Sequence, residues 1–194
     1  FDNAETIAVS DGGDGMLDAF AAAWGARQID VPTHDALMRH RTGRIAIAGD
    51  TAIIEVAQAV GLPFIEPEQR NPWTATSYGV GELIAEALRR CCRHLIIGLG
   101  GTATSDCGIG MLKALIKLLT HDGNIDDLHL GDIDVTLATD VDNPLLGDNG
   151  AAAVFAPQKG ASAEMVRRIE HRAATFSRLS AMHCHKDESA TPGA

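Results

Sequence analysis

Two aspartates in a glycine-rich stretch are the first residues of this chain that could do chemistry. Asp11 and Asp14 lie in Val9-Ser-Asp-Gly-Gly-Asp-Gly15, where Gly12 and Gly13 would let the backbone come close to a bound phosphate or nucleotide. Such a loop can hold Mg²⁺, orient a sugar hydroxyl or accept its proton. The alternative is that Asp11 caps a helix start and Asp14 stabilises the first turn. The sequence does not rank Asp11 against Asp14 as the proton acceptor.

A second glycine-rich stretch, Gly98 to Gly110, follows an apolar run and precedes a helix-favouring one. Its glycines and hydroxyl side chains, beside the free N–H groups of a helix start, suit an oxyanion such as phosphate. No Gly-Lys-Ser/Thr closes the loop as in a P-loop, and the third glycine of a dinucleotide fingerprint is missing. The alternative is a tight strand-to-helix turn. The predicted phosphate-binding residues are Gly100, Gly101, Thr102, Thr104, Ser105 and Asp106.

Arg70 and Asn71 stand in a proline-rich loop that would present them in a fixed place. A guanidinium can bind a carboxylate through two parallel hydrogen bonds. Arg70 and Asn71 are therefore predicted to bind the carboxylate of a substrate. The alternative for Arg70 is a solvated loop arginine.

Asp140 and Asp142 occupy alternate positions at the predicted end of a strand, so they would project to the same side. Two such carboxylates could hold Mg²⁺ or a hydroxyl. A turn formed by Asp-Asn-Pro is the alternative, and it explains Asp142 better than Asp140.

Lys159 follows in a loop of its own, Gln158-Lys-Gly160. Its ammonium could neutralise charge on a transferred phosphoryl group, a role that lysines take in unrelated kinases. Lys159 is therefore a predicted catalytic residue beside Asp11 and Asp14.

The elements that must position these residues alternate between strands and helices, which indicates an α/β fold. Strands are predicted at Thr6–Val9, Gln28–Val31, Arg44–Ala48, Thr51–Val56, His94–Gly98, Asp134–Thr139 and Ala151–Phe155. Helices are predicted at Gly15–Trp24, Ala57–Val60, Ser77–Arg90, Gly108–Leu119 and Ser162–Met182.

Two local patterns sharpen this assignment. Gly49-Asp50 between two strand-like runs predicts a tight hairpin, and the strand lengths after Val31 favour a mixed sheet. In the last helix an apolar stripe at spacings of three and four predicts a buried face, with Ser162 as the cap. The stripe consists of Met165, Ile169, Ala173, Phe176 and Leu179.

Composition excludes several classes of protein. The 194 residues are 45% hydrophobic and carry a formal net charge of −10, which argues against nucleic acid or an anionic membrane as the main partner. No apolar run approaches the ~18 residues of a membrane span. Four cysteines without paired spacing are predicted to be reduced thiols, and the location is predicted to be cytoplasmic.

Six separate motifs, taken together and in order, resemble those of bacterial glycerate kinases of the first type. They are Val9-Ser-Asp-Gly-Gly-Asp-Gly15, Arg70-Asn-Pro72, Tyr78-Gly-Val-Gly-Glu-Leu-Ile84, Gly100-Gly-Thr-Ala-Thr-Ser-Asp106, Asp140-Val-Asp-Asn-Pro-Leu145 and Phe155-Ala-Pro-Gln-Lys-Gly160. The resemblance covers essentially the whole chain. Family members run to nearly twice this length, so the chain resembles a central fragment that lacks both termini.

The resemblance implies an activity and an architecture. The activity is transfer of the γ-phosphoryl group of ATP, with Mg²⁺, to D-glycerate, which gives 2-phosphoglycerate. The architecture is a flavodoxin-like domain interrupted by a larger α/β domain with a mixed sheet. Residues 1–30 would belong to the outer domain and residues 31–194 to the inserted one.

Two other classes of function stay open at this point. One is an inactive fragment or a non-catalytic module that binds phosphate or nucleotide. The other is a Mg²⁺-dependent phosphohydrolase, although Asp132-Ile-Asp134 precedes its predicted strand instead of opening a strand-to-helix loop. The sequence does not indicate the oligomeric state.

Overall fold

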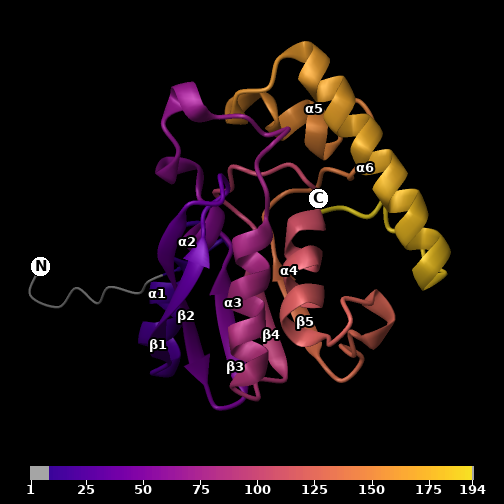
Figure 1. Cartoon of the computed structure of the whole chain (residues 1–194). Helices are drawn as coiled ribbons and strands as arrows, with labels where there is room; N and C mark the ends of the chain where they lie inside the picture. The colour runs from indigo at the N-terminus through magenta and orange to yellow at the C-terminus, as the bar shows by residue number, and fades with distance from the viewer. Residues whose placement is uncertain (1–8, 194) are drawn as a thin grey trace, which may run out of the picture.

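A five-stranded mixed sheet forms the centre of the computed structural model, which describes residues 9–193 (Figure 1). The strands, which lie side by side in chain order, are β1 (Arg27–His34), β2 (His40–Ala48), β3 (Thr51–Glu55), β4 (His94–Gly98) and β5 (Asp134–Ala138). β1, β2 and β3 pair antiparallel, whereas β3, β4 and β5 pair parallel. The predicted mixed sheet is therefore confirmed, and the carboxyl ends of β3, β4 and β5 meet at one edge.

Helices cover both faces of the sheet. They are α1 (Met16–Trp24), α2 (Ala57–Val60), α3 (Tyr78–Arg89), α4 (Ile109–Leu119), α5 (Ala151–Phe155) and α6 (Ala163–Cys184). On one face Met16 and Leu17 of α1 pack against Ala46 and Ile53 of the sheet. The larger core lies on the other face, under α2 and α3, and α4 packs beside α3 (Figure 1). Short 3₁₀ turns occur at η1 (Leu62–Phe64), η2 (Pro67–Gln69), η3 (Ile125–Asp127) and η4 (Pro157–Lys159).

The predicted hairpin between β2 and β3 is confirmed. Ala48 pairs with Thr51, and Gly49 adopts a φ of 62°. Glycine adopts this left-handed backbone conformation without steric cost, so Gly49 favours the two-residue turn.

The strand predicted at Ala151–Phe155 is wrong, because the structure has helix α5 there. Three consecutive alanines favour a helix, and the buried Ala152 and Ala156 stand one turn apart, packed in one cluster with Ile169 of α6. The prediction of a strand rested on a run of five apolar residues that includes Val154 and Phe155, which is too short to show a period. Of the strand predicted at Thr6–Val9, only Val9 lies within the described residues.

Helix α6 is confirmed over its whole predicted length, but its apolar stripe is buried only in the first half. The Ser162 side chain accepts a hydrogen bond from the Met165 N–H, and Ile169 and Ala173 are buried. Leu179, however, is 56% exposed, so the prediction of one continuous buried face is wrong there. The short α5 covers the first turns of α6, and Leu179 lies beyond that contact.

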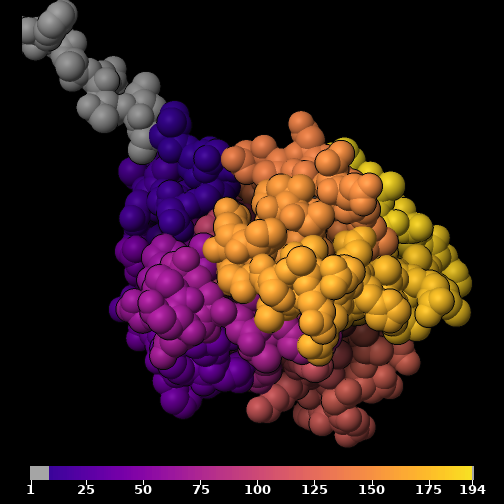
Figure 2. Space-filling model, turned by 90° about the horizontal axis from the view of Figure 1, so that it is seen from above, coloured from indigo at the N-terminus to yellow at the C-terminus, as the bar shows by residue number. Residues whose placement is uncertain are grey.

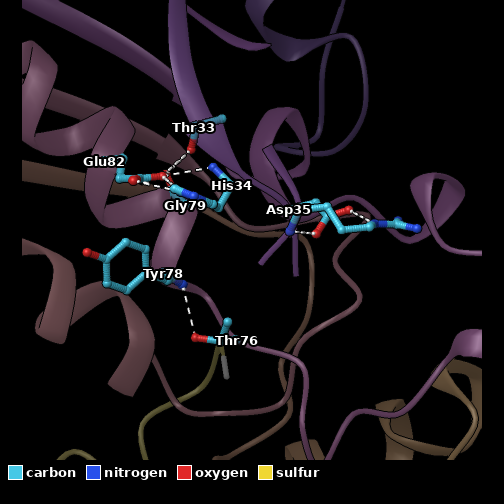
Figure 3. A network of polar contacts seen from close by, with 8 residues as sticks. Thr33, His34, Asp35, Thr76, Tyr78, Gly79 and Glu82 are labelled. Atoms are coloured by element: carbon cyan, nitrogen blue, oxygen red, sulfur yellow. Dashed lines mark hydrogen bonds and ion pairs between the residues drawn. The ribbon is translucent and has the colours of Figure 1, made fainter. Parts of the chain in front are cut away.

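A polar network fixes the end of β1 to the start of α3 (Figure 3). The Glu82 carboxylate accepts hydrogen bonds of 2.8 Å from the Thr33 hydroxyl and from the His34 N–H, and it lies 2.9 Å from His34 Nδ1. The Thr33 hydroxyl also reaches the Gly79 carbonyl at 3.0 Å. The segment that leads into α3 is therefore held in one place.

Three further findings bear on the expectations from the sequence. All four cysteines are free. β1 runs across the predicted domain division at residue 30, and that division stays a prediction. None of the helices within residues 9–193 is both long enough and apolar enough to cross a bilayer.

Candidate active site

The two glycine-rich loops predicted from the sequence lie directly against each other. The Gly100 N–H donates a 3.1 Å hydrogen bond to the Gly12 carbonyl. A Cβ at Gly100 would lie 2.7 Å from Cα of Gly13, and one at Gly12 would lie 2.4 Å from the Ala138 carbonyl oxygen. Side chains at these positions would collide with backbone, so the close approach depends on glycine. The structure thus brings loop 11–15 and loop 98–108 together at the carboxyl edge of the sheet.

Asp14 and Asp11 are both exposed, but they face different groups. A Cβ at Gly101 would lie 2.8 Å from Asp14 Oδ1, so the Asp14 carboxylate lies against the second loop. Asp11 Oδ1 instead accepts a 3.0 Å hydrogen bond from the Gly13 N–H within its own loop. Asp11 does not cap helix α1, whose N-cap is Gly15.

Glu55 supports the first loop, and sequence reasoning missed it. Its side chain is buried at the end of β3, and Oε2 accepts 3.1 Å hydrogen bonds from the N–H groups of Gly15 and Leu17. Gln58 Nε2 lies 3.2 Å from the other oxygen. A carboxylate at the start of α1 interacts favourably with the helix dipole. The signal in the sequence was an acid ending an otherwise buried strand, because a buried carboxylate needs donors.

Asp106 joins the starts of two helices. Its Oδ2 accepts hydrogen bonds from the Ser77 N–H at 2.9 Å, the Ser77 hydroxyl at 3.0 Å and the Gly110 N–H at 3.0 Å. Its Oδ1 lies 3.3 Å from the Gly108 nitrogen. The carboxylate therefore fixes the second loop between α3 and α4. Sequence reasoning proposed a phosphate contact for Asp106 and missed these protein donors.

Lys159 reaches the second loop from η4. Its Nζ donates to the Thr102 hydroxyl at 3.1 Å and to the Thr104 carbonyl at 2.5 Å. Burial lowers the pKa of Lys159 to about 8, although the nearby Asp106 carboxylate acts in the opposite direction. The structure thus brings Lys159 onto the loop that was predicted to bind phosphate.

A cavity of about 770 Å³ opens beside these groups, under the segment that carries α5 and α6. Figure 2 shows this segment, in orange and yellow, lying over much of the molecule as seen from above. The cavity wall is polar at the loop and apolar along β4, β5, α3 and α4. Its polar side includes Thr102, Thr104, Ser105, Asp140, Gln158 and Lys159.

Asp140 and Asp142 do not continue strand β5, which ends at Ala138. The predicted alternation on one strand is therefore wrong, because the chain turns into an irregular loop first. Asp140 lines the cavity, whereas Asp142 is exposed and is not part of its wall. Within the described residues no group of three or more His, Cys, Asp or Glu side chains could hold a metal. If a single carboxylate binds Mg²⁺ here, phosphate oxygens and water molecules would have to supply the other ligands, as they commonly do for Mg²⁺ in proteins.

The backbone of Arg70 lies against Gly160, the residue that follows Lys159. A Cβ at Gly160 would lie 2.9 Å from the Arg70 carbonyl oxygen. Arg70 Nε donates to the Ile65 carbonyl at 3.2 Å, and its two terminal nitrogens have no protein acceptor within residues 9–193. Asn71 Oδ1 accepts a 3.1 Å hydrogen bond from the Trp73 N–H, which shapes the loop.

Comparison with known proteins gives one consistent result. The model of the glycerate kinase family matches residues 2–194. The glycerate 2-kinase of Escherichia coli (strain K12) is 36% identical over 210 residues, which cover 97% of this chain and 55% of that protein. The glycerate kinase of Bacillus subtilis (strain 168) is 38% identical over 192 residues, or 88% of this chain and 50% of that protein.

A solved structure agrees. The crystal structure described as glycerate kinase 2 from Salmonella typhimurium LT2 superposes with a TM-score of 0.85 at 36% identity, and covers 94% of this chain and 55% of that one. The chain spans about half the length of the curated relatives it matches.

Proposed function

Because the chain belongs to the glycerate kinase family, we propose that this protein transfers the γ-phosphoryl group of ATP to D-glycerate and gives 2-phosphoglycerate. The observation that carries the proposal is the meeting of loop 98–108, Lys159 and Asp14 at one edge of the sheet. Phosphoryl transfer needs positioning and charge stabilisation more than reactive groups. Backbone donors, an ammonium and a carboxylate acceptor are the parts that this reaction uses.

Each part has a proposed role. Asp14 orients or deprotonates the glycerate hydroxyl, and its contact with Gly101 favours it over Asp11 for this role. The loop 100–106 binds phosphate, and Lys159 offsets the charge on the transferred group. The free end of the Arg70 guanidinium binds the substrate carboxylate, with Asn71 shaping its loop.

We expect Asp140, in the cavity wall, to hold Mg²⁺; Asp142, predicted as its second ligand, is exposed and is not part of that wall. When bound with ATP, the ion neutralises charge on the phosphate oxygens. Asp140 would hold it on the side of the cavity formed by the carboxyl end of β5.

The proposal includes the architecture that the family resemblance implies. We expect residues 1–30 to belong to a flavodoxin-like domain and residues 31–194 to an α/β domain inserted into it. A cytoplasmic location and the absence of nucleic acid and membrane partners stay predictions from composition.

A ³¹P NMR time course with ATP, Mg²⁺ and D-glycerate tests the proposal. It is run on this chain and on a version extended to the length of the curated relatives. Appearance of 2-phosphoglycerate with the extended version supports the proposal. ATP binding without turnover in both would favour a non-catalytic module instead, and release of inorganic phosphate without phosphorylated glycerate would favour a hydrolase.

A further inference from the structure

Two consecutive carbonyl oxygens of loop 98–108 accept hydrogen bonds from cationic side chains. Lys159 Nζ donates to the Thr104 carbonyl at 2.5 Å, and Arg172 Nη2 donates to the Ser105 carbonyl at 3.0 Å. Arg172 lies on α6, and its Nη1 also donates to the Trp73 carbonyl at 2.8 Å. One arginine therefore joins the loop 100–106 to the loop that carries Arg70.

The orientation of these carbonyls fixes the amide groups next to them. No peptide bond in the described part of the chain is cis, so the C=O and N–H of one peptide unit point in opposite directions. The N–H groups of Ser105 and Asp106 therefore point away from Lys159 and Arg172. Within residues 9–193 neither N–H has a protein acceptor. Both residues contribute to the cavity wall, and a backbone N–H without a protein acceptor is a donor that a bound anion can use.

Arg172 has no carboxylate within ion-pair distance among the described residues. Its guanidinium binds backbone carbonyls and stacks on Trp73, 4.5 Å from the ring centroid. Its charge is thus not cancelled by an acid and adds to that of Lys159 beside the loop. A carbonyl turned toward the cavity would repel phosphate, whereas one held by Arg172 does not.

We propose that Arg172 is a positioning residue for phosphate binding, which turns the Ser105–Asp106 peptide so that its N–H donates to the phosphate chain of the nucleotide. The inference deepens the proposed kinase function and rests on it. Arg172 does not touch the phosphate itself and acts through the Ser105 carbonyl. Nothing in the motif pattern of the sequence pointed to this residue.

The chain offers a matched control in Arg168. Its guanidinium stacks on the same Trp73 ring, 4.2 Å from the centroid, but it makes no hydrogen bond to the loop. Arg172→Met and Arg168→Met each remove one stacked arginine from α6, and only the first releases the Ser105 carbonyl. The variants are made in the extended version of the protein. Equilibrium binding of ATP–Mg²⁺ is measured by calorimetry, beside kcat, KM for ATP and thermal unfolding.

R172M is expected to weaken ATP–Mg²⁺ binding and to raise KM for ATP by about tenfold, the usual scale for loss of a charged hydrogen bond. R168M is expected to stay within twofold of the unaltered protein. Arg172→Lys keeps the charge but cannot reach the Trp73 and Ser105 carbonyls together, so an intermediate loss is expected. A merely structural role would lower the unfolding temperature and leave the ATP affinity of the folded protein unchanged.

Two results would overturn the inference. One is ATP affinity within twofold of the unaltered protein in folded R172M or R172K. The other is loss of cooperative unfolding in both variants while R168M folds, because Arg172 would then act on stability alone. Failure of the kinase proposal looks different: the unaltered extended protein binds ATP–Mg²⁺ but forms no phosphorylated glycerate, and the binding comparison among the variants still decides the role of Arg172.

Discussion

Loop 11–15 and loop 98–108 have similar composition but opposite electrostatic character. Each is glycine-rich and leads into a helix, and each contains aspartate. In loop 11–15 the N–H groups at the helix start are bound by Glu55, and the Asp14 carboxylate is left exposed. In loop 98–108 the Asp106 carboxylate is bound by protein donors, and the N–H groups of Ser105 and Asp106, two residues of the cavity wall, have no acceptor within residues 9–193.

The proposed roles of the two loops thus depend on the polar groups that the fold leaves without a protein partner. One loop keeps an acceptor, which suits the hydroxyl of a substrate. The other keeps donors, which suit phosphate. Glu55 of β3 binds the N–H groups at the start of α1, and the Asp106 carboxylate is itself bound by the N–H groups of Ser77 and Gly110, so these groups are not available to a ligand.

The largest effect is expected from removing the exposed acceptor. Asp14→Asn in the extended protein should lower kcat by ~100-fold or more, because a positioned acid–base group contributes on that scale. Stability should change little, since the side chain is exposed. Steady-state kinetics and urea denaturation measure both, with Asp11→Asn as the control. Unchanged turnover in a folded D14N protein would remove Asp14 from the proposed role and direct attention to Asp11.

In loop 98–108 the corresponding change, at Asp106, should lower stability. Asp106→Ala leaves the Ser77 and Gly110 N–H groups without their acceptor, and we expect a loss of about 3 kcal/mol in the free energy of unfolding. Urea denaturation measures this loss, provided that the m-value does not change. Asp11→Ala, which removes an exposed carboxylate, is the control. A loss below about 1 kcal/mol would show that the Asp106 carboxylate does not hold the starts of α3 and α4 together.

Replacing Glu55, which supports loop 11–15, should have a smaller effect on stability than replacing Asp106. Glu55→Ala removes the acceptor of the Gly15 and Leu17 N–H groups and should lower the free energy of unfolding by about 2 kcal/mol. Glu55→Gln keeps an acceptor oxygen and should recover part of that loss and of the catalytic rate. Asp18→Ala is the control, because Asp18 is an exposed acid in the same first turn of α1 whose side chain contacts Gln28 and Arg44 instead of the helix N–H groups. Equal losses in E55A and D18A would contradict a specific role for Glu55.

The smallest effect concerns pH. The pKa of Lys159 is lowered by burial to about 8, so its ammonium is lost as the pH rises through 8. We expect kcat/KM to fall about tenfold between pH 7 and pH 9 and the fall to be absent in Lys159→Met. Lys113→Met, at an exposed lysine, is the control. A flat profile in the unaltered protein would contradict a need for the charged form.

The free energy of unfolding should rise with pH over the range in which kcat/KM falls. The folded pKa of Lys159 lies below its ordinary value of 10.5, so between pH 8 and 10.5 the unfolded chain binds more protons than the folded one. The burial penalty on the ammonium, which is full below pH 8, therefore diminishes as the pH rises. The stability of the unaltered protein relative to K159M should increase over this range, as urea denaturation at several pH values would show.

Sequence patterns predicted most of the fold and the neighbourhood of the site. Long apolar runs such as His94–Gly98 and the Gly49-Asp50 turn were sufficient for β4 and for the hairpin. The five residues of α5 were assigned to the wrong class, because so short a run carries no clear period and its helix depends on packing against α6.

The roles of Glu55, Asp106 and Arg172 could not be read from local patterns. Each depends on a partner far along the chain, and the side-chain type alone does not show whether a carboxylate or guanidinium faces ligand or backbone. Family motifs placed Lys159 in the same site as loop 98–108, but only the fold showed that its contacts are Thr102 and Thr104.

The contacts of α6 and η4 also have a consequence for the order in which the protein becomes functional as it is made. Lys159 and Arg172 follow the loop carbonyls that they bind by 55 and 67 residues, and Arg172 follows Trp73 by 99. The loop 100–106 therefore leaves the ribosome well before the two cations that orient it. A nascent chain can thus complete its sheet while the proposed phosphate site is still unformed, and on our proposal the site forms only when α6 packs against the loop.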